Sequence, residues 1–144
     1  MKILDLLKNV SIDVNATCSN KDEAIDTLVS LMAKQGNLND QDVYKQGIYA
    51  REELSTTGIG EGIAIPHAQS EAVNAPGLAA MVVKDGVDYQ SLDNQPAKLF
   101  FMIAVPKTGG NEHLQILAML SQMLIDTDFK DSLIKSFLCF NCAG

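Results

Sequence analysis

The chain has 144 residues, of which 47% are hydrophobic and 20% are charged, so one domain over residues 1–144 with its own core is expected. The net charge of −7 argues against a nucleic-acid partner, because phosphate backbones attract clustered Lys and Arg. No apolar run approaches the roughly 20 residues that cross a membrane, and three cysteines do not suggest a disulfide framework. We therefore expect a cytoplasmic domain that does not insert into a membrane.

Two helices are predicted in the first third of the chain. Asn20 followed by Glu23 is typical of a helix N-terminal capping pair, and Gly36 offers a stop after apolar residues at helical spacing. A second helix is expected from residue 39 or 40 to about residue 53. Arg51 interrupts the apolar or small face of that helix.

The next segment combines alternating glycines with a short apolar run. Glycines recur between residues 58 and 62, Ile63–Ile65 follows, and Pro66 and His67 come next. Because proline cannot donate to a sheet ladder, we expect a strand that stops at Pro66 and carries His67 at its tip. A histidine on a rigid stem beside a loop rich in N–H donors is suited to act as a nucleophile.

Two further strands are predicted from continuous apolar runs. Ala79–Val83 is expected to end at the turn Asp85–Gly86, and Leu99–Val105 is expected to stop at Pro106. Continuous apolar strands separated by helical patterns favour a sheet that is covered on both faces. The predicted class is therefore α/β, with a central β-sheet flanked by helices on both faces in three layers.

The last third of the chain predicts two more helices. Asn111 can cap a helix whose apolar face includes His113, and another amphipathic stretch begins near Asp128. A histidine in the first turn of a helix lies near free backbone N–H groups, which attract anions.

The final residues, 138–144, are mostly apolar and are interpreted as the end of a longer chain or as a non-native end. Cys139 and Cys142 are spaced as in some zinc and redox motifs. A zinc site needs further ligands and a redox pair needs a strand-to-helix setting, and neither accompanies them. No role is assigned to the two cysteines.

The chemistry-bearing residues suit a transient phosphohistidine. A histidine is a nucleophile at neutral pH, and an arginine holds phosphate oxygens bidentately. Each residue also has an ordinary structural explanation, such as a satisfied core histidine or a cation at a helix C-terminus, so composition alone leaves both open. Candidate donors stand just before the glycines, namely Arg51, Ser55, Thr56 and Thr57.

Together these segments resemble the phosphorylation-site signature of a known family. The family is the fructose/mannitol-type enzyme IIA domains of the bacterial phosphoenolpyruvate-dependent sugar phosphotransferase system, and the chain is most similar to the fructose-type branch. The resemblance covers about residues 3–135. The matching segments are Glu52, Ile59–Gly60 and Ile63–Ala68 in the signature, Arg51–Thr57 upstream of it, and Phe101–Pro106 with Asn111–Gln115 in a second block.

The resemblance implies a function and a fold. The histidine matching His67 accepts a phosphoryl group from the phosphocarrier HPr, or a fused HPr-like domain, and passes it to a cysteine of the IIB domain, and a membrane IIC component moves the sugar. No metal or organic cofactor is implied, and the family fold is α/β with a central mixed sheet between helical layers. The residues that the resemblance implies around the phosphoryl group are His113 and Arg51, with Glu61 in the same pocket. Thr57 and Ser55 are expected to join them as donors, because they stand just before the glycines.

Two other functions are compatible with these residues. Nitrogen-type relatives share the phosphohistidine and act by binding other proteins instead of feeding a transporter. A metal-dependent hydrolase could use His67 and His113 as ligands, with Glu61 as the third, although no third ligand stands at a characteristic spacing. In one departure from the family, Gln69 stands where many relatives carry Lys or Arg, so one contact to a partner is expected to be missing.

Overall fold

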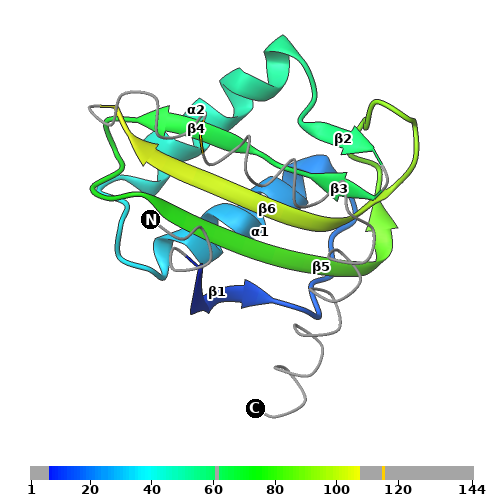
Figure 1. Ribbon diagram of the computed structural model, residues 1–144, viewed down its shortest axis with the longest axis horizontal. Coiled ribbons are helices and arrows are strands. Elements are labelled where there is room, and N and C mark those ends of the chain that lie inside the picture. Colours follow the sequence, from blue (N-terminus) through cyan, green and yellow to red (C-terminus); the bar gives the residue numbers. More distant parts are fainter. Residues whose placement is uncertain (1–6, 61, 108–114, 116–144) are drawn as a thin grey trace.

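The computed structural model describes residues 7–60, 62–107 and 115 (Figure 1). These residues form a mixed sheet with two helices packed on it, which confirms the predicted α/β class. Neither helix is long and apolar enough to cross a membrane. The elements in chain order are β1 (Leu7–Asp13), α1 (Lys21–Ala33), α2 (Gln41–Leu54), β2 (Gly58–Gly60), β3 (Ile63–Ala64), β4 (His67–Ser70), β5 (Gly77–Val87) and β6 (Ala97–Pro106).

The long strand β6 organises the sheet. It pairs antiparallel with β5 on one side and parallel with both β3 and β4 on the other, so β3 and β4 follow each other along the same edge of β6. The outer strands are β1, which is parallel to β5, and β2, which is antiparallel to β3. Neither of these outer strands is predicted from the sequence.

Both predicted helix starts are confirmed by their caps. The side chain of Asn20 accepts a hydrogen bond from the backbone N–H of Glu23 at 2.9 Å. Asp40 accepts from the N–H groups of Asp42 and Val43 at 3.1 and 3.2 Å. Each cap satisfies N–H groups that the first turn of a helix leaves without partners.

The two helices pack on one face of the sheet, and the opposite face is buried as well. Side chains facing the helices alternate along β5 and β6 with side chains that point to the other face. Both sets are almost fully buried, as the continuous apolar runs predict. The set facing the helices includes Ala79, Met81, Phe100 and Met102, and the opposite set includes Leu78, Ala80, Phe101 and Ile103. The helices predicted after Asn111 lie outside the described residues.

The predicted end of β5 is wrong. The strand continues beyond Val83 through Asp85–Gly86 to Val87, which pairs with Ala97. The register shifts between Val82 and Val87, and Gly86 has a φ of +80°. A glycine in that conformation lets the strand bulge and then resume pairing, so the Asp-Gly pair marks an irregularity within the strand instead of a turn that ends it.

The close approach of Gly58 to Ser91 gives a test of the packing around β2. A Cβ atom on Gly58 would lie 2.9 Å from Cα of Ser91, which is backbone and cannot turn away. Gly58→Ala should therefore destabilise the fold by about 1–3 kcal/mol in urea unfolding. The matched control is Gly47→Ala in α2, where the new Cβ would lie 3.5 Å from Cβ of Ala68, an ordinary contact. That variant should gain about 0.5–1 kcal/mol from helix propensity, and an unchanged midpoint for Gly58→Ala would contradict the packing.

Candidate functional site

His67 begins β4 and is not at the tip of a strand. It pairs with Ile103 of β6. Strand β3 pairs with the same side of β6 at an earlier point, through Ile63 and Ala64. The prediction that His67 lies at a strand tip is wrong, because Pro66 lacks only the backbone N–H and keeps its carbonyl. Its carbonyl still accepts a hydrogen bond from the N–H of Ile103 at 3.0 Å, so the chain stays alongside β6 and the pairing resumes.

The imidazole of His67 is held in a defined orientation. The residue is 8% exposed, and Nδ1 lies 2.9 Å from the carbonyl oxygen of Ile65. A carbonyl oxygen only accepts, so Nδ1 carries the hydrogen in this bond. The neutral ring then keeps its nucleophilic lone pair on Nε2.

Helix α2 brings Arg51 to the His67 end of β4. Gly47 faces Ala68, the residue after His67, because a Cβ atom on this glycine would lie 3.5 Å from that of Ala68. Figure 1 shows α2 lying across β4 and running in the opposite direction. Arg51 follows Gly47 by one turn on the same helix face, so it lies toward the start of β4. Arg51 and His67 therefore belong to the same end of the packed α2–β4 pair, and a contact of the guanidinium with a group bound to His67 stays a prediction.

Arg51 also closes the end of α2. Its Nη1 donates to the carbonyl oxygen of Ser55 at 2.9 Å and lies 3.4 Å from the Ser55 hydroxyl oxygen. Ser55 is the C-cap of the helix and has an extended backbone. A guanidinium has five N–H donors in a planar fork, so one nitrogen can hold the backbone while other N–H groups bind an anion.

Thr57 is buried and both its donors point to Glu52. Its backbone N–H donates to Oε1 of Glu52 at 3.0 Å, and its hydroxyl donates to Oε2. Direct binding of phosphate by Thr57 would require that hydroxyl to turn, and it stays a prediction. Glu61 and His113 lie outside the described residues, so their predicted places in the pocket also stay predictions.

The partner of Glu52 is Lys21 at the start of α1, and the sequence does not predict this pair. Nζ of Lys21 lies 3.0 Å from Oε1 of Glu52, and the two side chains are only 15% and 5% exposed. The ammonium also lies 4.6 Å from the ring centroid of Tyr89. Nothing in the local pattern around Lys21 predicts this contact, because it joins the beginning of one helix to the end of another.

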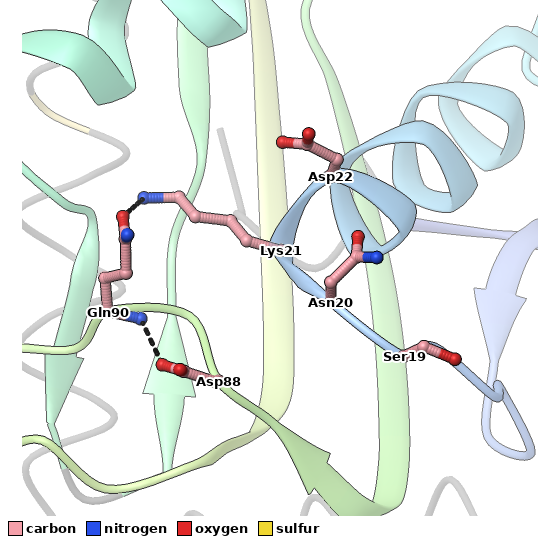
Figure 2. A pocket seen from close by; sticks show the side chains of 6 residues that line it. All are labelled: Ser19, Asn20, Lys21, Asp22, Asp88 and Gln90. Carbon is pink, nitrogen blue, oxygen red and sulfur yellow. Dashed lines mark hydrogen bonds between the residues drawn. The ribbon is translucent and has the colours of Figure 1, made fainter.

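Lys21 also borders a surface pocket of about 400 Å³ (Figure 2). Figure 2 shows its side chain extending from the first turn of α1 to Gln90, whose Oε1 lies 3.5 Å from Nζ. The backbone N–H of Gln90 donates to Asp88 at 3.1 Å. Within the part of the chain that the structure describes, no three His, Cys, Asp or Glu side chains gather in a way that could hold a metal ion.

Comparison with known proteins identifies the family. The family model for the phosphoenolpyruvate-dependent sugar phosphotransferase system, EIIA 2, matches residues 5–137. The chain belongs to this family. It is an EIIA domain, a phosphotransferase component of that system, and the resemblance found from its sequence motifs is confirmed.

The relatives of this EIIA domain include fructose-specific proteins. It is 46% identical over 136 residues to the fructose-specific EIIABC component of Bacillus subtilis (strain 168), covering 94% of the chain and 21% of that protein. It is 41% identical over 118 residues to the fructose-specific EIIA component of Haloferax volcanii, covering 82% of the chain and 77% of that protein. The chain thus spans about a fifth of the Bacillus relative.

Solved structures share the fold of this EIIA domain. The nitrogen regulatory protein IIA-Ntr from Neisseria meningitidis superimposes with a TM-score of 0.84 at 25% identity, covering 92% of this chain and 90% of that one. The mannitol enzyme IIA of Escherichia coli, solved in complex with phosphorylated enzyme IIB, gives a TM-score of 0.72 at 28% identity, covering 92% and 89%. That mannitol enzyme IIA thus forms a complex with phosphorylated enzyme IIB.

The raised pKa values of the three tyrosines indicate how the stability of the EIIA domain changes at alkaline pH. Burial raises the pKa of Tyr44 well above its ordinary value of about 10, and burial together with the charge of Glu52 raises the pKa of Tyr89. Burial, helped by Asp26, raises the pKa of Tyr49. The folded chain thus favours neutral phenols, so this contribution to stability is complete below about pH 10 and is lost as pH rises toward the folded-state pKa values.

In an alkaline titration, tyrosinate absorbance should therefore rise together with the loss of helical circular dichroism. The chain has three tyrosines and no tryptophan, so the absorbance reports these residues alone. Gradual ionisation near pH 10 with the circular dichroism still native would contradict the burial of these phenols.

Proposed function

We propose that Nε2 of His67 accepts a phosphoryl group from phosphorylated HPr, or from an HPr-like domain, and passes it to a cysteine of a IIB domain. The observation that carries this proposal is the bond from Nδ1 to the Ile65 carbonyl, which directs the lone pair to Nε2. In the first step the Nε2–phosphorus bond forms as the bond between phosphorus and the donor breaks. In the second step a cysteine thiolate takes the phosphoryl group and returns the neutral imidazole.

In this proposal, Arg51 stabilises the phosphoryl group. Phosphoryl transfer depends on positioning and on electrostatic stabilisation of the equatorial oxygens more than on covalent help. This role is supported by the bond that anchors the guanidinium to the Ser55 carbonyl. It is also supported by the direction of α2, which runs toward the start of β4, where His67 lies (Figure 1). His113, Glu61, Thr57 and Ser55 complete the proposed pocket.

The proposed setting is a fructose-type sugar phosphotransferase system in the cytoplasm. The fructose-specific relatives support it, and in the Bacillus relative the A, B and C components belong to one protein. The IIC component would then act indirectly, by moving the sugar that receives the phosphoryl group.

A nitrogen-type regulatory role is the second candidate, and the TM-score of 0.84 to IIA-Ntr favours it. The two roles differ in the fate of the phosphoryl group. A transport component passes it to a IIB cysteine, whereas a regulator changes its binding to another protein. Transfer from the phosphorylated chain to IIB at a catalytic rate would favour transport.

The acceptor is tested by reconstitution with phosphoenolpyruvate, enzyme I and HPr. Wild-type protein should gain one acid-labile phosphate on His67, located by mass spectrometry, and ³¹P–¹⁵N NMR should place it on Nε2. His67→Ala should remove the label while leaving the circular dichroism spectrum native. Wild-type labelling of that variant, or phosphate on Nδ1 in the native protein, would contradict the proposal.

Arg51→Lys tests the guanidinium. The lysine keeps the charge and loses the planar fork, so the rate of acceptance from phosphorylated HPr should fall by the equivalent of about 1–3 kcal/mol. The unfolding midpoint should be measured in parallel, because the same change removes the bond to the Ser55 carbonyl. A lower midpoint with an unchanged transfer rate would show that Arg51 only closes the helix.

A further inference from the structure

A buried ion pair lies beside the site and has no part in the chemistry proposed above. The side chain of Glu52 is 5% exposed, and its charge is balanced by Lys21, whose Nζ lies 3.0 Å from Oε1. Taking two charges out of water is costly, and their attraction often does no more than offset that cost. A pair of this kind therefore calls for an explanation other than general stability.

Glu52 fixes the segment that leads into β2. Each of its two oxygens accepts a hydrogen bond from Thr57, one from the backbone N–H and one from the hydroxyl. Hydrogen bonds to an ionised carboxylate are stronger than those between neutral groups. Glu52 thus holds both donors of one residue, and the ammonium of Lys21 lies against the same carboxylate.

Thr57 in turn fixes the carbonyl that orients His67. The carbonyl oxygen of Thr57 accepts from the backbone N–H of Ile65 at 3.0 Å. Ile65 lies in the break between β3 and β4, so this bond holds it where neither strand does. The carbonyl of Ile65 then accepts from Nδ1 of His67 at 2.9 Å. Three consecutive links join the ion pair to the imidazole.

We propose that Glu52, supported by Lys21, is a positioning residue that fixes the ring orientation and the tautomer of His67 through Thr57 and Ile65. Loss of the carboxylate charge weakens the hold on Thr57, which frees the Ile65 carbonyl to move and releases the Nδ1 proton from its partner. The effect on phosphoryl transfer rests on the function proposed for His67. The effect on the tautomer does not.

The experiment compares two ion pairs that join the same two helices. Lys21–Glu52 connects α1 to α2 beside the site, and Lys45–Asp26 connects α2 to α1 at 3.4 Å on the surface. The test variants are Glu52→Gln and Lys21→Met, with Lys21→Arg as the conservative variant that keeps a cation. Lys45→Met is the matched control, because it removes a lysine from an interhelix pair that does not contact Thr57.

The first measurement is the tautomer of His67 in the unphosphorylated protein, from ¹H–¹⁵N NMR of the ring nitrogens. Wild type and Lys45→Met should show the Nδ1–H form. Glu52→Gln and Lys21→Met should show a mixture, and Lys21→Arg should return most of the way to the wild-type spectrum. A wild-type spectrum in Glu52→Gln, or the same mixture in Lys45→Met, would overturn the proposal.

The second measurement is acceptance from phosphorylated HPr, which should slow on the order of tenfold in Glu52→Gln and stay unchanged in Lys45→Met. A wild-type rate in Glu52→Gln would also overturn the proposed role. If Glu52→Gln does not fold, the tautomer spectra of Lys21→Met and Lys21→Arg decide whether the ion pair fixes His67: a mixture in Lys21→Met alone supports the proposal, and identical spectra overturn it. If the wild-type protein is not phosphorylated at all, the function proposed for His67 fails, and the tautomer measurement still decides the role of Glu52.

Discussion

The break at Pro66 is the constraint on which the arrangement of the site depends. Pro66 cannot donate to β6, so the pairing along this side of β6 is interrupted between Ala64 and His67. Because of this interruption, the Ile65 carbonyl accepts a hydrogen bond from the side chain of His67 instead of from a neighbouring strand. The chain nevertheless stays in register with β6, because the Pro66 carbonyl accepts from Ile103. The imidazole thus gains a fixed hydrogen-bond partner without leaving the rigid sheet.

The helix packed on this edge is fixed to the same position of β6. The hydroxyl of Tyr44 donates to the carbonyl of Ile103 at 2.9 Å, and Ile103 pairs with His67. Gly47 packs against Ala68 one turn further along the helix, and Arg51 follows after another turn. The position of α2 on β4 is therefore set by buried contacts between closely packed groups.

Local patterns allowed much of this fold to be predicted from the sequence. The cap at Asn20, the helix start near residue 40 and the apolar run of β6 depend on neighbours in the chain, and all three predictions are confirmed. The strand tip at His67 and the end of β5 at Gly86 were predicted wrongly. In both cases a residue that usually stops a strand only interrupts it, because pairing with β6 resumes on the far side.

In the candidate site, too, the features that depend on neighbouring residues could be predicted and those that depend on tertiary packing could not. The motif around His67 and Arg51 was sufficient to identify the family, since its residues stand close together in the sequence. The pair Lys21–Glu52 could not be predicted, because it depends on how α1 lies against the end of α2. No periodicity or cap in either helix encodes that contact.

The position of Glu52 is itself an argument for its role. A carboxylate in the last turn of a helix faces the negative end of the helix dipole, which disfavours it, whereas Arg51 in the same turn is favoured. Two adjacent residues of opposite charge thus hold the connection after α2 at two points, Arg51 at Ser55 and Glu52 at Thr57. Burial adds a further cost for Glu52, and Lys21 offsets part of it. Glu52 is thus unfavourable for its own helix but well bonded to the segment that leads to the imidazole. This combination fits a role in positioning His67 better than a role in stabilising the helix.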